Sequence, residues 1–198
     1  PRHVLEALRQ PMEDSFVTIS RAKGSVTYPA SFLLVAASNP CPCGYYGDPK
    51  RACTCFPGAV SRYQKRISGP ILDRIDIHID VPSVDTQKLV EEDKIKREDS
   101  KRIQKRVQTA RDIQTKEFRT LKIKSNGEMS TRDVKKFCPL SLECRQMLSS
   151  AVTSMNLSAR SYFKVVKIAR TIADLASDKD ISIIHIAEAL QYRPKLED

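Results

Sequence analysis

The segment from Ser158 to Ser177 constrains the fold most, because its apolar residues recur at the three- and four-residue spacing of a single helix face. The face consists of Tyr162, Val165, Val166, Ala169, Ile172, Ala173 and Ala176. Ser158 is a suitable N-cap for this helix. Weaker apolar stripes predict helices at 141–154 and 182–192. Because such helices must bury their apolar faces against one another, we expect a small helical bundle.

The front of the chain carries strand patterns instead. An opening helix should end near Gln10, because Pro11 disfavours helical geometry in the residue before it. Two β-rich runs, 16–20 and 25–28, predict a hairpin with a basic tip.

Two further runs predict a sheet. Residues 32–37 form an unbroken apolar run, which is typical of a strand buried on both faces in the middle of a parallel sheet. Residues 75–81 alternate apolar and polar, so we expect a strand that ends at Pro82.

The segments between these elements are polar or basic. Residues 39–58 are rich in Pro, Gly, Cys and Tyr and predict a loop, and 60–67 predict a short helix. Residues 94–124 hold twelve Lys or Arg against four Asp or Glu, which indicates a long, mostly solvated helix and a linker. We therefore divide the chain into the rear part of an α/β domain, 1–90, and an all-α domain, 91–198.

The charge and hydropathy of the chain indicate which classes of partner it can bind. The net charge of +10 and the pI near 9.4 favour a polyanionic partner, because Lys and Arg release counterions from phosphates. No run approaches the ~18 apolar residues of a membrane span, so we expect a soluble, cytoplasmic protein without membrane contact. The chain begins without Met, and Val4, Leu5 and Leu8 already share a helix face, so we expect a piece of a longer protein.

Six cysteines fall into two groups. Cys41, Cys43, Cys53 and Cys55 form two Cys-x-Cys pairs, and four thiolates so close in sequence could complete a tetrahedral structural zinc site. Disulfides or free thiols are the alternatives. Cys138 and Cys144 suit buried apolar positions. The histidines, His3, His78 and His185, are scattered and form no hydrolase or zinc-protease pattern.

Three motifs together resemble one family. They are Ile67-Ser-Gly-Pro-Ile-Leu-Asp-Arg-Ile-Asp-Ile-His-Ile-Asp80, Leu33-Leu-Val-Ala-Ala-Ser-Asn-Pro40 and Leu157-Ser-Ala-Arg160. The chain is similar along nearly its whole length to the magnesium-chelatase-like AAA+ ATPases, and most closely to their competence protein M branch, a family of DNA helicases. The resemblance implies the rear half of a parallel-sheet ATPase core followed by a helical lid.

The resemblance also implies roles for single residues. Asn39 resembles sensor 1, which orients the attacking water; from the residues alone it could simply turn the chain. Arg74 resembles the arginine finger that reaches a neighbouring subunit's nucleotide, whereas the alternative is a surface ion pair with Asp73 or Asp76. Arg160 resembles sensor 2, against the alternative of one more solvated arginine.

The basic hairpin resembles the pore-facing hairpin of related motors. Lys23 then contacts a DNA phosphate with Arg21 in support, although basic hairpin tips are also ordinary solubility features. The family implies a hexamer that remodels DNA, by branch migration in recombination or natural transformation. The phosphate-binding loop and the Mg²⁺-binding Asp-Glu strand are absent from the sequence. We therefore expect ATP and Mg²⁺ to bind upstream in the parent, and this chain alone to be inactive, as a monomer or weak dimer.

Two other functions fit some of these features. A magnesium-chelatase motor subunit would drive metal insertion into a porphyrin, with no stimulation by DNA. A non-catalytic, zinc-stapled nucleic-acid adaptor would bind through the basic residues 94–124. A strong, salt-sensitive affinity for duplex DNA that is independent of Arg74 and Lys23 would favour the adaptor.

Overall fold

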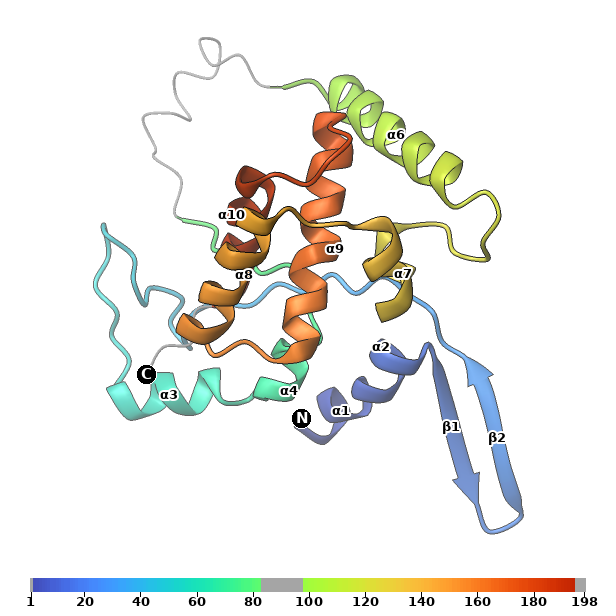
Figure 1. The fold of residues 1–198 in the computed structure, drawn as a ribbon. Helices are drawn as coiled ribbons and strands as arrows, with labels where there is room; N and C mark the ends of the chain where they lie inside the picture. The colour runs from blue at the N-terminus through green and yellow to red at the C-terminus, as the bar shows by residue number, and fades with distance from the viewer. Residues whose placement is uncertain (1, 83–97, 195–198) are drawn as a thin grey trace. The chain divides into compact units, whose positions relative to one another are not determined.

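The computed structural model describes residues 2–82 and 98–194 (Figure 1). They form helices and one small two-stranded sheet, divided between two compact units. The first unit comprises Pro1–Ile75 and Asp80–Val84, and the second comprises Asp76–Ile79 and Asp85–Asp198. Within the described ranges, no helix has the length and apolar character to cross a membrane.

The first unit opens with two short helices, α1 (Arg2–Ala7) and α2 (Arg9–Asp14). The prediction that helical structure ends near Gln10 is wrong, because Pro11 lies inside α2. Pro11 is the third residue of that helix, where a backbone N–H would have no acceptor within the helix. Helix α2 ends instead at Ser15, which adopts a left-handed conformation with φ of 59°.

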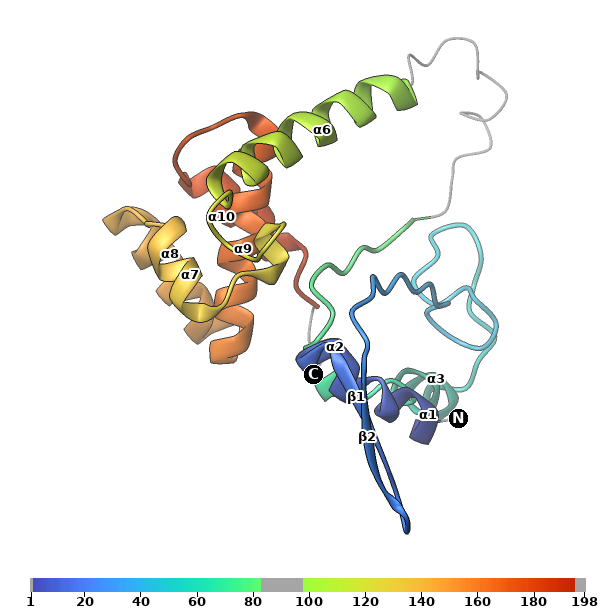
Figure 2. The same ribbon diagram turned by 90° about the vertical axis from the view of Figure 1, so that its right-hand side faces the viewer.

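The predicted hairpin is confirmed. Strands β1 (Phe16–Arg21) and β2 (Gly24–Pro29) pair antiparallel around a two-residue turn, and Figures 1 and 2 show them as a long ribbon. One face carries cross-strand hydroxyl pairs, Thr18 with Thr27 at 3.0 Å and Ser20 with Ser25 at 2.8 Å. The opposite face carries apolar pairs, Val17 opposite Tyr28 and Ile19 opposite Val26.

The two other predicted strands are wrong. Residues 32–37 and 75–81 have no regular secondary structure, and the side chains of Leu33 and Val35 are 89% and 84% exposed. An extended segment becomes a strand only when a neighbour completes its backbone hydrogen bonds. Among the described residues the only sheet is the hairpin. In 75–81 the backbone N–H of His78 donates to the carbonyl of Tyr192 at 2.9 Å, but no strand pairing extends from this contact.

The rest of the first unit is a loop followed by two helices. Residues 39–56 contain only turns and bends, as predicted, and lead into α3 (Pro57–Gln64). The predicted helix 60–67 exists but begins earlier, because Pro57 occupies its first position, which suits proline. A single turn, α4 (Gly69–Leu72), follows. Among the described residues of this unit, the buried apolar side chains are those of Cys41, Val60 and Ile71.

The second unit is a helical bundle, as predicted. Its elements are α6 (Ser100–Glu117), the 3-10 turn η2 (Asn126–Glu128), α7 (Thr131–Phe137), α8 (Leu142–Ser154), α9 (Ala159–Ala176) and α10 (Ile183–Gln191). Both views show α9 at the centre, and it contacts α10, α6, η2 and α7. Residues 94–97 of the predicted basic helix lie outside the described residues.

Helix α9 is central because of the stripe that its sequence carries. Val165, Val166, Ala169 and Ala173 are fully or almost fully buried, and Ser158 caps the helix by accepting a hydrogen bond from the backbone N–H of Ser161. Cys138 and Cys144 are buried in the same core, which confirms their predicted apolar role.

A buried polar cluster joins three elements of this bundle. The Asp174 carboxylate on α9 accepts hydrogen bonds from Gln114 Nε2 of α6 at 3.1 Å and Asn126 Nδ2 of η2 at 2.7 Å. It also forms an ion pair with Arg170 Nε at 2.9 Å. Asp174, Gln114 and Asn126 are all buried and help to line a surface pocket, and their hydrogen bonds join α6 and η2 to α9.

Candidate functional site

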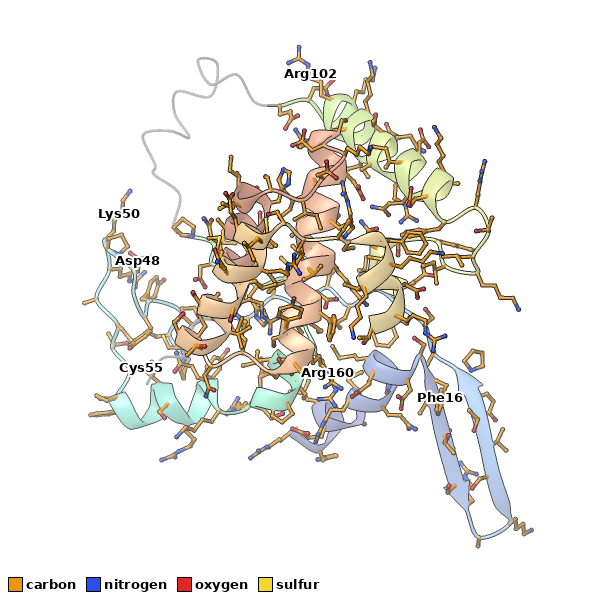
Figure 3. The ribbon with its side chains drawn as sticks, viewed as in Figure 1. Phe16, Asp48, Lys50, Cys55, Arg102 and Arg160 are labelled. Carbon is orange, nitrogen blue, oxygen red and sulfur yellow. The ribbon has the colours of Figure 1, made fainter. Side chains whose placement is uncertain are left out.

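The loop 39–56 brings the four predicted cysteines together. Their Sγ atoms all lie within 4.8 Å of one another and could hold a metal ion. Three separations are short: Cys41 to Cys43 at 3.3 Å, Cys43 to Cys53 at 3.5 Å and Cys41 to Cys53 at 3.7 Å. All four are free thiols, which is the form that can become a set of metal ligands. Figure 3 labels Cys55 near the start of α3 and Asp48 and Lys50 at the outer end of the loop.

The thiols of this cluster differ in acidity. The backbone N–H groups of Tyr45 and Thr54 lower the pKa of Cys43 to about 5, since they stabilise its thiolate. The backbone N–H of Cys55 lowers the pKa of Cys53, but burial and the neighbouring thiols outweigh it and raise that pKa to about 12. Four sulfurs this close cannot all ionise without a cation to balance their charge.

Asn39 lies beside this cluster. The Cγ atom of Asn39 is 4.0 Å from the position that a Cβ atom on Gly44 would occupy, so its amide lies over the turn that follows Cys43. The next residue, Pro40, accepts a hydrogen bond through its carbonyl from Gln64 Nε2 of α3 at 3.4 Å. Asn39 is exposed, with the turn at Gly44 beside its amide and the residue after it tied to α3.

Arg74 follows α4 and is engaged within its own unit. Its Nη1 donates to the carbonyl of Pro70 at 2.7 Å, and its Nη2 forms an ion pair with Glu13 of α2 at 2.5 Å. The side chain of Arg74 is only 13% exposed. Of the two acidic partners weighed from the sequence, Asp76 forms an ion pair with Lys164 at 2.9 Å. The sequence did not indicate Glu13, which lies 61 residues from Arg74.

Arg160 is the second residue of α9, in its first turn (Figure 3). The start of this helix is anchored by contacts that sequence reasoning missed. Arg193, which is buried just beyond α10, donates from Nη2 to Ser161 Oγ at 2.9 Å. Ser161 is buried as well and contacts the capping residue Ser158. Nothing in the types or the spacing of these two residues indicated that they would meet.

Basic side chains are exposed in two places. Arg21 and Lys23 lie at the hairpin tip, where all of residues 20–25 are exposed. Helix α6 exposes Lys101, Arg102 and Lys105 along a face with few apolar neighbours, and Figure 3 labels Arg102 near its start. Both surfaces could attract phosphates by charge alone.

His185 has a structural place. It is buried at the start of α10, where its Nδ1 contacts the Ser182 backbone N–H at 3.2 Å and its Nε2 lies 3.2 Å from Asp178. This side chain closes a capping box, so it belongs to the helix end rather than to a reactive centre.

Comparisons with known proteins account for both units. The family model described as "Magnesium chelatase, subunit ChlI" matches residues 1–89, and "Magnesium chelatase, subunit ChlI C-terminal" matches residues 97–193. Competence protein ComM of Haemophilus influenzae is 39% identical over 193 residues, which cover 97% of this chain and 36% of ComM.

Uncharacterized proteins named YifB match over a similar length. The YifB of Salmonella typhimurium is 36% identical and that of Escherichia coli 35% identical, each over 97% of this chain and 37% of the relative. The chain thus spans somewhat more than a third of the length of these curated relatives. It belongs to the magnesium-chelatase-like family. Within that family its relatives are those of the ComM/YifB branch, which confirms the resemblance seen in the sequence.

Proposed function

We propose that this chain is part of a ring-forming AAA+ ATPase that couples ATP hydrolysis to DNA remodelling. The observation that carries the proposal is the match of both units to one family, with a ComM relative that spans nearly the whole chain. That relative is named as a competence protein. Branch migration in recombination or natural transformation is the task that we propose for the parent.

Asn39, Arg74 and Arg160 act on a nucleotide that is bound by parts of the parent outside this chain. ATP and Mg²⁺ are the cofactors of the parent, and they supply the phosphoryl group and neutralise its charge. Arg74 reaches the nucleotide of the neighbouring subunit, Asn39 orients the attacking water, and Arg160 contacts the γ-phosphate from the lid. A guanidinium suits both arginine roles because its planar fork binds phosphate oxygens and stays charged.

The exposed apolar segments support an AAA+ core. Phe32, Leu33 and Val35 are exposed although their run is one of the most hydrophobic in the sequence. We propose that 32–37 becomes a central strand of a parallel sheet once strands from the rest of the parent pair with it. Residues 1–90 then complete the ATPase core, and residues 91–198 form its helical lid.

The hairpin is the proposed contact to DNA. Lys23 and Arg21 project from a long ribbon whose other side chains are small or apolar, so their charges stand apart at its tip. In a hexamer the six tips would surround a central pore in the cytoplasm. We also propose Zn²⁺ as the ion of the cysteine cluster, and a monomer or weak dimer for the chain alone.

The first experiment is the ATPase activity of the full-length parent with and without DNA, at one salt concentration because phosphate contacts depend on salt. The variants are Arg74→Ala, Lys23→Ala and the matched control Glu13→Gln. Arg74→Ala removes the finger, whereas Glu13→Gln keeps Arg74 and removes the charge of the carboxylate with which it pairs in its own unit. We expect Arg74→Ala to lower turnover by about 10³-fold or more, and Glu13→Gln to leave it nearly unchanged.

Each outcome separates one function from another. If Arg74→Ala and Glu13→Gln lowered turnover equally, the role of Arg74 would be structural, through its ion pair with Glu13. Loss of DNA stimulation in Lys23→Ala, with basal turnover kept, supports a DNA motor. Turnover that depends on Arg74 but ignores DNA would point to a chelatase-type motor instead.

A further inference from the structure

The loop 39–56 is held by local polar contacts and has little apolar core. Asp48 accepts from the backbone N–H groups of Lys50 and Arg51, and Arg51 donates to the Tyr45 hydroxyl at 2.7 Å. It contains no helix or strand, and among its residues only Cys41 is buried. Ordering each residue of such a loop costs conformational entropy, which burial of apolar surface does not offset here. A crosslink, either covalent or through a metal, would stabilise a loop of this kind.

The arrangement of the four sulfurs fits a metal better than disulfides. Sulfurs in a tetrahedron around zinc, with Zn–S near 2.3 Å, are about 3.8 Å apart. The short Sγ–Sγ separations of 3.3–3.7 Å, with all four within 4.8 Å, approach that tetrahedron. A disulfide would need one pair at about 2.05 Å and would leave the other two sulfurs outside it.

The backbone around the sulfurs is arranged for thiolates. Cys41 Sγ accepts hydrogen bonds from backbone N–H groups of Tyr46 and Gly44, and Cys43 Sγ accepts them from Tyr45 and Thr54. Cys53 Sγ and Cys55 Sγ each accept one, from Cys55 and Cys43 respectively. Such outer contacts orient metal-bound sulfurs and stabilise their negative charge. The two halves of the loop thus enclose one site from both sides.

Gly44 connects this site with Asn39. Its φ of +85° lets the chain turn sharply after Cys43, and a Cβ atom added there would lie in ordinary van der Waals contact with Asn39 Cγ, at 4.0 Å. Asn39 is also only two residues from the buried ligand Cys41. A change in the shape of the loop therefore moves Asn39 directly.

We propose that Cys41, Cys43, Cys53 and Cys55 bind one Zn²⁺, and that the ion, by folding the loop, fixes the Asn39 side chain for its role in ATP hydrolysis. The second half of this statement rests on the proposed ATPase function. Asn39 is then the group that touches the reaction, and the zinc site is its positioning element. Tetrahedral thiolate sites also suit iron, so the identity of the metal is part of the test.

The first measurement is metal content, which needs no activity. The full-length parent, purified without added metal, is analysed by mass spectrometry for zinc and iron, beside Cys53→Ser and the control Cys138→Ala. We expect one zinc per chain in the wild type and the control, and at least a tenfold loss in Cys53→Ser. Iron as the bound metal, or no metal, would overturn the zinc assignment.

Thiol titration after denaturation in chelator distinguishes disulfides. All six cysteines of the chain should react, since zinc leaves them reduced. A shortfall of two or four thiols, without zinc, would establish disulfides instead. Cobalt exchanged into the site should show the strong ligand-field absorption of a tetrahedral thiolate complex, and a weak octahedral spectrum would contradict the four-cysteine set.

The second measurement tests the link to Asn39 by a double-mutant cycle on turnover, with Asn39→Ala, Cys53→Ser and the double variant. We expect Cys53→Ser to lower kcat at least tenfold while the KM for ATP changes less than threefold. The double variant should be no slower than Asn39→Ala alone. If the double variant lost activity by the product of the two single fold-losses, the positioning role would be refuted, whereas the zinc site itself would not.

Gly44→Ala provides a second route in case Cys53→Ser fails to fold. It keeps all four thiols but strains the turn at positive φ and adds a methyl group beside Asn39. We expect full zinc content with a lowered kcat. Unchanged kcat would refute the link to Asn39. A parent that binds zinc but hydrolyses no ATP under any condition would refute the ATPase proposal and leave the metal site intact.

Discussion

Asp174 offers the sharpest test of what holds the helical unit together. Its buried carboxylate accepts hydrogen bonds from Gln114 and Asn126 and pairs with Arg170. Replacing it with alanine leaves these donors without their shared acceptor, in the wall of the pocket that they line. Removing one partner of a buried ion pair typically costs about 3–5 kcal/mol.

After the change to alanine, two of the three donor residues keep other hydrogen-bond acceptors, so the loss of stability should lie near the lower end of that range. Arg170 keeps the carbonyls of Lys179 at 2.7 Å and Asp178 at 2.6 Å, and Asn126 keeps Thr171 Oγ1 at 3.1 Å. Gln114 Nε2 loses its bond to Asp174. We therefore expect Asp174→Ala to lower the free energy of unfolding by about 3 kcal/mol. Asp174→Asn keeps the shape and one acceptor, so a loss of about 1–2 kcal/mol is expected.

Urea unfolding followed by far-ultraviolet circular dichroism reports on this unit, because it holds most of the helix. The control is Asp180→Asn, an exposed acidic residue, for which we expect a change within about 0.5 kcal/mol. If Asp174→Ala cost no more than the control, the three donors would have to find other partners. The buried cluster would then not be what joins α6 and η2 to α9.

Three further predictions concern the same unit. Ser158→Ala should lower its stability by about 1 kcal/mol, because the cap on Ser161 N–H is lost, whereas Ser158→Asp should retain it; equal losses would contradict capping. Leu148→Ala, at a fully buried position, should cost about 2–5 kcal/mol in urea unfolding, and a loss below 1 kcal/mol would mean that the core closes over the gap. Burial raises the pKa of Cys138 to about 11, above its value in the unfolded chain. The stabilisation that the protonated thiol gives to the folded state is therefore complete below about pH 9 and is lost as the pH rises toward 11. Urea midpoints should fall over that window, and less so in Cys138→Ala; a flat profile would refute the shift.

Local patterns predicted the helical bundle well. Helices α8, α9 and α10 begin directly after Ser141, Ser158 and Ser182, because an apolar stripe and a capping serine are both encoded within a few residues. The hairpin was equally readable, since its alternation and its turn are local. The burial of Cys144 followed from the apolar stripe of α8, and that of Cys138 from the preference of free cysteines for buried positions.

The predictions that failed depended on partners far away. The runs 32–37 and 75–81 have strand-like sequences, but a strand forms only where another segment of chain supplies hydrogen-bonding partners. The apolar pattern of a run does not reveal whether such a segment lies beside it. Pro11 is tolerated inside α2 because it lies in the first turn of that helix. The sequence rule for proline could not show this, because it does not say where the helix begins.

The candidate site shows the same division. The sequence by itself determined the family, the amphipathic bundle, the basic hairpin and the presence of two Cys-x-Cys pairs. Only the tertiary structure decided that the four sulfurs converge, that Asn39 lies over Gly44 and that Arg74 meets Glu13. The physical reason is range: caps, turns and stripes act over a few residues of chain, whereas these contacts join side chains that are brought together only when the loop and helices pack.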